Sequence, residues 1–160
     1  MLTAACSGPT AGPTAEPAPP PPPQAAPPSA PPDQPAALPP ACPLLPKPEA
    51  EALAGTPLVD GVESNPASPQ CLYAGPTSGP VAQVEVFVGD GAKKFLDIDR
   101  EHAHEFTEVP GIGEEAHAED NAIFARVGRT WFAVRLVRLN DPARNAPALV
   151  TAATAVAGRL

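Results

Sequence analysis

The sequence predicts an α+β fold, in which a small, mainly antiparallel sheet packs with about three helices behind a proline-rich segment. Two observations predict it. Extended patterns come in runs along the chain and do not alternate singly with helical patterns, which favours antiparallel pairing over a parallel βαβ sheet. In addition, 18 of the 26 prolines lie between Pro9 and Pro48, where they remove backbone donors and fix φ. Only the later part of the 160-residue chain can therefore form a core.

The first predicted helix follows Cys42. Pro48 suits an early helical position, and Gly55 suits the residue after the helix because glycine tolerates the left-handed conformation there. Two short extended pieces are expected next, at residues 58–62 and 71–73.

The clearest strand spans residues 81–88, in which valine recurs at every second position from Val84 and predicts one buried face. Asp90 can cap a helix over residues 92–106. The expected apolar stripe of this helix consists of Phe95, Ile98, His102 and Phe106.

A hairpin is predicted beyond a polar loop at residues 108–116. Its strands are residues 122–127 and 130–139, with a glycine-containing turn between them. A final helix over residues 147–159 would begin after Asn145 as N-cap. Together the elements predict an antiparallel sheet that helices cover on one face.

The charge balance excludes one class of partner. The formal net charge is −8, and such an acidic surface repels phosphate backbones, so no nucleic-acid partner is expected. Basic residues do gather between Arg126 and Arg144, either as the solvated face of the hairpin or as a patch for an anionic ligand. No stretch has the roughly 20 apolar residues that a membrane-spanning helix needs.

The N-terminus carries a motif around Cys6. Small residues precede Cys6, and Ser7 and Gly8 follow it, which resembles the lipobox of bacterial lipoproteins. The resemblance implies cleavage before Cys6 and acylation of its thiol, and two acyl chains suffice for stable membrane anchoring. Five residues before Cys6 are fewer than a secretion signal needs, so a start upstream of Met1 or a trimmed chain is expected. The alternative is an ordinary cysteine in a disordered tail.

Residues 1–6 are thus interpreted as the remnant of a lipoprotein signal, residues 7–40 as a linker and residues 41–160 as the folded domain. The linker is rich in Pro and Ala and predicts a polyproline II spacer, at about 3.1 Å per residue. A ligand for SH3-type modules is the alternative, but no Lys or Arg stands between Cys6 and Lys47 to flank such a motif.

Cys42 and Cys71 fall inside the predicted domain. In an exported protein such a pair indicates a disulfide, whereas two buried free thiols are the alternative. A zinc site is not favoured, because no second Cys or His stands at ligand spacing.

Several short motifs follow one another in this region: Cys42-Pro43-Leu44-Leu45, Cys71-x-Tyr73, Gly111-Ile112-Gly113-Glu114-Glu115-Ala116 and Ala125-Arg126-Val127-Gly128. Their order resembles a group of actinobacterial lipoproteins of unknown function, over residues 42–160. The resemblance implies an envelope location and a disulfide between the two cysteines, and it implies no catalytic residues. Lys47 departs from the pattern, which often has Thr or Ser at that position.

Catalytic and metal-binding patterns are weak. His102 and His104 are two apart on a predicted helix and do not face each other. Residues 117–120 could offer metal ligands from a loop, although acids in loops are usually just solvated. Residues 97–101 lack the glycine and distal glutamate of a calcium loop. We therefore expect no cofactor, no metal and no enzyme activity.

A contact surface is the remaining candidate. Trp131 faces away from Phe132 on its strand, and together with Arg129 and Arg135 it could contact a partner if that face is open to solvent. Packing of Trp131 against a helix is the alternative. The sequence thus predicts a membrane-anchored envelope lipoprotein, on the extracellular side, with a non-enzymatic binding or accessory domain of unknown ligand. The alternatives are an envelope enzyme with a loop site near His117 and a cytosolic domain with a disordered tail.

Overall fold

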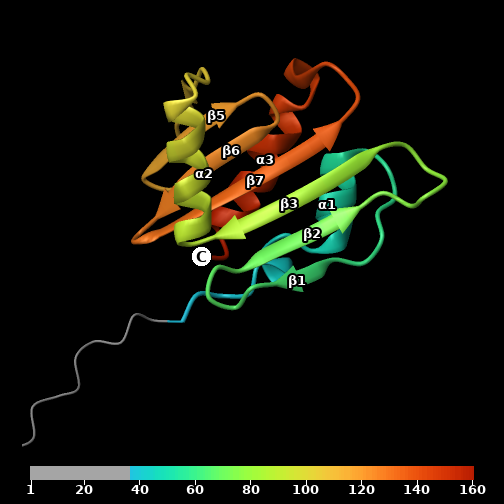
Figure 1. Cartoon of the computed structure of the whole chain (residues 1–160), viewed down its shortest axis with the longest axis horizontal. Helices are drawn as coiled ribbons and strands as arrows, with labels where there is room; N and C mark the ends of the chain where they lie inside the picture. The colour runs from blue at the N-terminus through green and yellow to red at the C-terminus, as the bar shows by residue number, and fades with distance from the viewer. Residues whose placement is uncertain (1–36) are drawn as a thin grey trace, which may run out of the picture. The chain divides into compact units, whose positions relative to one another are not determined.

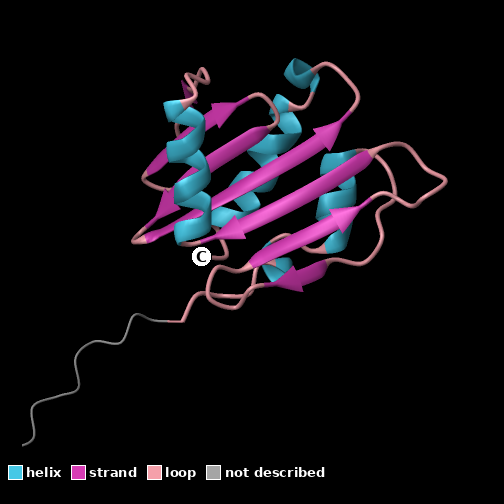
Figure 2. Ribbon diagram, in the orientation of Figure 1, coloured by secondary structure: helices cyan, strands magenta, loops and turns pink. Residues whose placement is uncertain are grey.

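The computed structural model describes residues 37–160, which belong to one compact unit that begins at Ala36. The predicted α+β class is confirmed: a seven-stranded antiparallel sheet packs with three α-helices (Figures 1 and 2). The elements in order are η1 Cys42–Leu44, α1 Lys47–Ala54, β1 Val62–Ser64, β2 Gln70–Ala74, β3 Ala82–Val88, α2 Asp90–Glu101, β4 Thr107–Glu108, β5 Glu115–Glu119, β6 Ala122–Val127, β7 Thr130–Arg138, η2 Pro142–Arg144 and α3 Ala146–Ala157.

The strand order across the sheet is β1-β2-β3-β7-β6-β5-β4. Two long strands, β3 and β7, pair at the centre over seven residue pairs. Residues that stand directly opposite one another share a face. One such row runs across six strands as Val62, Leu72, Glu85, Arg135, Ala122 and Glu119.

Helices cover both faces of this sheet, so the expectation of a single covered face was wrong. Helices α1 and α3 lie on one side and α2 lies on the other (Figure 1). The second core forms because strands at the centre bury both sets of alternating side chains. Phe87, Phe124 and Ala133 pack there against Ala92 and Leu96 of α2. In β3, Phe87 alternates with Val84, Val86 and Val88 and therefore lies on the face opposite theirs.

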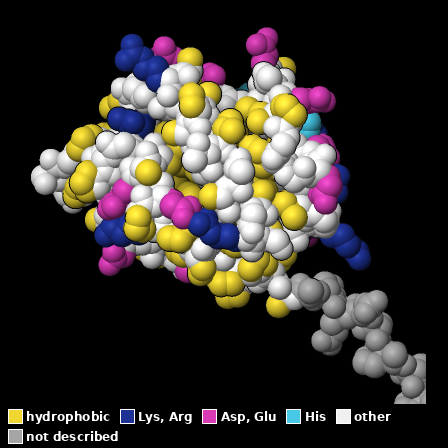
Figure 3. Space-filling model, turned by 180° about the vertical axis from the view of Figure 1, so that it is seen from behind, with side chains coloured by type: hydrophobic (Ala, Val, Ile, Leu, Met, Phe, Trp, Pro, Cys, Tyr) yellow, Lys and Arg dark blue, Asp and Glu magenta, His cyan; other side chains and the backbone are white. Residues whose placement is uncertain are grey.

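The larger core lies between the sheet and the pair α1 and α3. Figure 3 views the molecule from this side and shows apolar side chains interspersed with charged ones. Between the two helices lies a groove of about 350 Å³, lined by Glu49, Ala52, Leu53, Ala148, Thr151, Ala152 and Ala155.

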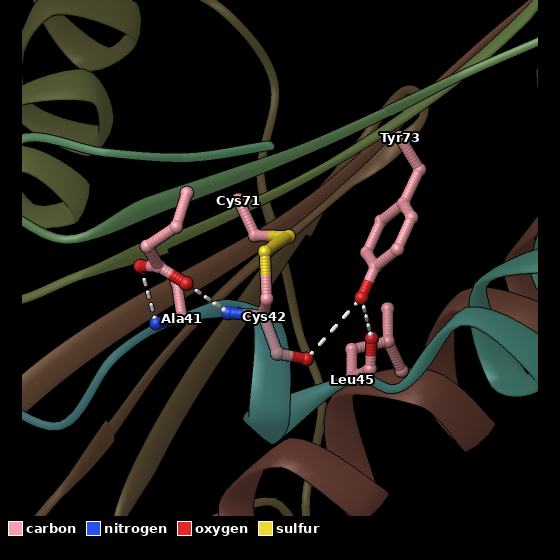
Figure 4. The surroundings of a disulfide bond; sticks show 6 residues. Ala41, Cys42, Leu45, Cys71 and Tyr73 are labelled. Carbon is pink, nitrogen blue, oxygen red and sulfur yellow. Dashed lines mark hydrogen bonds between the residues drawn. A yellow bond between two sulfur atoms is a disulfide. The ribbon is translucent and has the colours of Figure 1, made fainter. Parts of the chain in front are cut away.

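The disulfide between Cys42 and Cys71 is present, as predicted, and joins η1 to β2. Polar contacts hold the same junction (Figure 4). The Tyr73 hydroxyl donates to the carbonyl oxygen of Leu45 at 2.8 Å, while the carboxylate of Glu63 accepts from the backbone N–H of Cys42 at 2.7 Å. The start of the folded unit is thereby fixed to the sheet.

Helix α2 differs from its prediction in length and in orientation. It ends at Glu101, five residues early, and Ala92 and Leu96 are its fully buried residues, whereas Ile98 is 46% exposed. Phe106 lies beyond the helix end and packs edge-on against Phe124 at 6.2 Å between ring centroids. The buried face of α2 follows from the direction in which the helix crosses the sheet, which the sequence alone does not give.

Three other expectations need correction. The first extended piece forms a strand only at its last residue, because β1 begins at Val62. Residues 115–119, expected as loop, form β5, and Thr107 begins the short strand β4. Asp90 lies inside α2. Asn145 stands at the N-cap of α3 but makes no capping bond, because its Oδ1 atom accepts from the side-chain amide of Asn140 at 2.8 Å instead.

Candidate functional site

A group of three polar side chains meets where the C-terminal end of α2 passes over β5. Asp99 lies in the last turn of α2, His104 lies three residues beyond the helix, and Glu119 is the last residue of β5. One side-chain ligand atom of each lies within 4.8 Å of those of the other two. We call these three residues the Asp99 cluster.

The helix end explains how His104 reaches Asp99. Ala103 adopts a left-handed conformation, with φ of 59°, which reverses the chain after α2. The backbone N–H of His104 then donates to the carbonyl oxygen of Asp99 at 3.0 Å. Because a left-handed alanine costs on the order of 1 kcal/mol, the surrounding contacts must hold this turn.

The sheet register brings Glu119 to the same place. Glu119 pairs with Ala122, and Ala122 pairs with Arg135, so all three point to the face that α2 covers. Ala122 is buried in the core under α2. The side chain of Glu119 therefore lies under the end of the helix and is only 9% exposed.

Within the cluster, the Nδ1 atom of His104 lies 2.9 Å from the Oε2 atom of Glu119. Burial raises the pKa of Glu119, and the charge of Asp99 acts in the same direction, while the hydrogen bond from His104 opposes them. The hydrogen bond to Glu119 raises the pKa of His104, and the carboxylates of Asp99 and Asp120 add to this effect. The carboxylates of the Asp99 cluster thus favour a positive charge at the position of the His104 imidazole.

A surface cavity of about 490 Å³ opens beside the cluster. It is lined by His104, Glu105, Glu119, Asp120 and Arg135. The guanidinium of Arg135 is already engaged, because it lies 3.3 Å from the carboxylate of Glu85 and 5.6 Å above the ring of Phe95. One imidazole and two carboxylates are ligand types that divalent metal ions accept, so the cluster could hold such an ion beside an open cavity.

No protein-family model, curated protein or solved structure matches this chain. The role of the Asp99 cluster is therefore inferred from its own residues.

The structure changes the interpretation of residues 117–120. His117 lies in β5 and not in a loop, with its side chain 12% exposed. Its Nε2 atom lies 2.9 Å from the carboxylate of Glu115, and its ring meets Phe106 edge-on. Of this segment only Glu119 joins the cluster, while His102 follows the last residue of α2 and is exposed.

Cys42, Glu63 and Cys71 also lie within ligand distance of one another. The two sulfur atoms are bonded in the disulfide and have no thiolate to offer a metal. Residues 37–160 accordingly contain no free thiol.

The predicted contact surface is only partly open. Trp131 is half-buried against the core under α2, with the Nζ atom of Lys93 at 5.6 Å from its ring centroid. Arg129 is exposed in the turn of the hairpin, whereas Arg135 lines the cavity described above. Trp131 therefore packs against helix α2, which was the alternative expected. A contact role for Arg129, Trp131 and Arg135 stays a prediction.

Cys6 and the proline-rich linker up to residue 36 lie outside the described residues. Among the helices of residues 37–160, none has the length and apolar character needed to cross a bilayer.

Proposed function

We propose that this chain is a lipid-anchored protein on the extracellular side of a cell membrane, whose α+β domain binds an envelope component or a partner protein without catalysing a reaction. The disulfide between Cys42 and Cys71 carries the proposal. Disulfides form and persist in oxidising compartments and are rare in the cytosol, so an exported location agrees with this bond and a cytosolic one does not.

The position of the bond supports a tethered domain. Cys42 stands at the start of the folded unit, close to where the proline-rich linker ends in the sequence. Ala41 is fully buried, and the carboxylate of Glu63 accepts its backbone N–H at 2.7 Å. A domain held on a linker is pulled at this junction, and covalent attachment to β2 keeps the first turn in place.

Intact mass of the native protein from the membrane fraction tests the anchor. We expect a chain that begins at Cys6, carries added acyl mass and is two mass units lighter than its reduced form. The matched control is Cys6→Ser, which should lose the acyl mass and leave the membrane fraction while keeping the disulfide. An unmodified chain that starts at Met1, with thiols at Cys42 and Cys71, would contradict the proposal and support a cytosolic domain.

Equilibrium binding to wall fractions and membrane extracts tests the binding role. The full chain should bind at least one fraction, and Arg129→Ala should weaken that binding if the exposed turn of the hairpin takes part. Arg159→Ala is the control, because Arg159 lies away from the hairpin turn. It donates to Glu49 and to the carbonyl oxygen of Leu44, beside helices α1 and α3. Absence of binding to every fraction would contradict a binding role.

The alternative of an enzyme near His117 is not favoured. That alternative requires a loop whose side chains offer ligands to a metal ion. However, His117 lies in a strand, and its Nε2 atom forms a hydrogen bond with the carboxylate of Glu115.

A further inference from the structure

We propose that Asp99, His104 and Glu119 bind a divalent transition-metal ion of the Zn²⁺ class. The inference concerns a metal site and does not depend on the lipid anchor or on the envelope location. Its starting point is that three side chains from two separate elements and a loop bring ligand atoms together within 4.8 Å.

The distances are compatible with coordination after small side-chain movements. A tetrahedral ion that lies about 2.1 Å from each donor requires donor atoms about 3.4 Å apart. The pair formed by His104 and Glu119, at 2.9 Å, would open by about half an ångström, and a donor at the limit of 4.8 Å would approach by about 1.4 Å. His104 has 52% of its side chain exposed and Asp99 is half-buried, so both can move, while Glu119 stays fixed by burial.

Charge supplies the second argument. Glu119 is nine-tenths buried, and burial of a carboxylate is costly unless a positive charge is near. Among residues 37–160 its only ion pair is with His104, and Asp99 has no ion pair at all. Arg135 lines the same cavity, but its guanidinium is paired with Glu85. Two carboxylates therefore converge without a resident cation other than a protonated imidazole.

The ligand types indicate which ion fits. Imidazole nitrogen suits zinc, iron and related ions, whereas calcium and magnesium favour shells of oxygen alone. The site offers one nitrogen and two carboxylates, and within the Irving–Williams series Zn²⁺ binds such donors more tightly than Mn²⁺ or Fe²⁺. Three protein ligands leave a fourth position for water or a ligand atom.

The cavity provides a route of entry. The 490 Å³ space beside the cluster is open to His104 and Glu119, and two further acids, Glu105 and Asp120, line it. Negative side chains around an opening raise the local concentration of cations. A bound ion would also have its open coordination position on this side, where an anionic or polar group of a ligand could reach it.

The site would join α2 to β5. Asp99 belongs to the helix and Glu119 to the strand, while His104 lies in the turn that Ala103 reverses. A metal ion that binds all three would restrain that turn and the helix end, since it links groups that otherwise share one hydrogen bond.

Isothermal titration of the oxidised full-length chain with Zn²⁺ tests the inference, in metal-free buffer and without a histidine tag. We expect one ion per chain with a dissociation constant in the micromolar range. His104→Ala and Glu119→Gln should each weaken binding by at least about tenfold, since even the loss of outer contacts costs 10- to 100-fold at metal sites. The matched control His102→Ala removes an exposed imidazole two residues away and should leave binding unchanged.

A spectroscopic measurement separates specific coordination from loose surface binding. Co²⁺ added to the full-length chain should give visible absorption of a four- or five-coordinate ion, and Zn²⁺ should displace it in one-to-one ratio. Circular dichroism of each variant shows whether it is folded. The inference is overturned if the folded wild-type chain binds no stoichiometric Zn²⁺, or if folded His104→Ala and Glu119→Gln bind it as well as the wild type does.

Discussion

Replacing both disulfide cysteines should destabilise the domain strongly. The double variant Cys42→Ala and Cys71→Ala removes the bond and leaves no thiol among residues 37–160, while alanine keeps both positions apolar. Cys71 is fully buried in β2, so the cavity left by its sulfur adds a small cost to the loss of the cross-link.

The magnitude follows from the closed loop. The bond spans a sequence separation of 29 residues. In the chain-entropy model, opening a loop of that length lowers the free energy of unfolding by about 3.5 kcal/mol at 25 °C. The unfolding entropy of the 124 described residues is about 0.26 kcal/mol per kelvin, from about 2.1 cal/mol/K per residue. The expected fall in Tm is therefore about 13 °C.

Thermal unfolding followed by circular dichroism measures this difference. The control is the wild type with its disulfide reduced, and its Tm should fall by a similar amount. If Tm decreased by less than about 4 °C, the reasoning would be refuted, because opening the loop would then not raise the conformational entropy of the unfolded chain as assumed. Urea unfolding of the double variant should also show a larger m-value, since its unfolded state is more extended.

Three further predictions concern other contacts. Leu96→Ala should lower the free energy of unfolding, measured in urea, by about 2–5 kcal/mol, because Leu96 is fully buried. Ile98→Ala, at a site 46% exposed, should change it by less than about 1 kcal/mol. Equal effects of the two substitutions would contradict the position of α2. Tyr73→Phe should cost about 1–3 kcal/mol in the same assay, because it leaves a buried carbonyl oxygen without its donor, and no loss would contradict that bond. Arg159 holds the pKa of Glu49 below its ordinary value of 4.5, so the stability from this pair is present above that value and is lost as pH falls through the pKa of the folded state. NMR titration should show the pKa of Glu49 return toward 4.5 in Arg159→Ala, and an unchanged pKa would exclude the ion pair as the cause.

Local patterns predicted the parts of the fold that local physics decides. Alternation in residues 81–88 and the hairpin pattern at residues 122–139 predicted three strands to within one residue at each end. Gly55 ends α1 in the left-handed conformation that its position indicated, with φ of 63°. In each case the signal lies within one element or at its end, so no knowledge of neighbours is needed.

The orientation of α2 could not be predicted in this way. Phe95 of the predicted stripe packs partly buried against the second core, but Ile98 is exposed, and the fully buried residues are Ala92 and Leu96. Which stripe faces the sheet depends on where α2 crosses β3, β7 and β6, which the sequence of the helix does not specify. The same uncertainty hid the second core, because Phe87 belongs to it only when a helix lies on its side of the sheet.

The Asp99 cluster was hidden for a related reason. Asp99 and His104 are five positions apart, a spacing typical of no metal motif, and Glu119 comes fifteen residues after His104. Their approach requires an early end to α2, a left-handed Ala103 and the register of β5, three features that the sequence does not display together. The one local signal was the group of acids and a histidine at residues 117–120, of which only Glu119 takes part.

The disulfide and the Asp99 cluster lie on opposite sides of the central pair formed by β3 and β7. Pairing is longest at that centre, where seven residues of each strand are matched, whereas β1 pairs over three residues and β4 over two. The disulfide fixes the β1–β2 side through Cys71, and the cluster joins α2 to β5 on the other side through Glu119. Each therefore joins another segment of the chain to one side of the sheet, so reduction of the disulfide should act on the β1–β2 side, whereas loss of the contact between His104 and Glu119 should act on the side of β5.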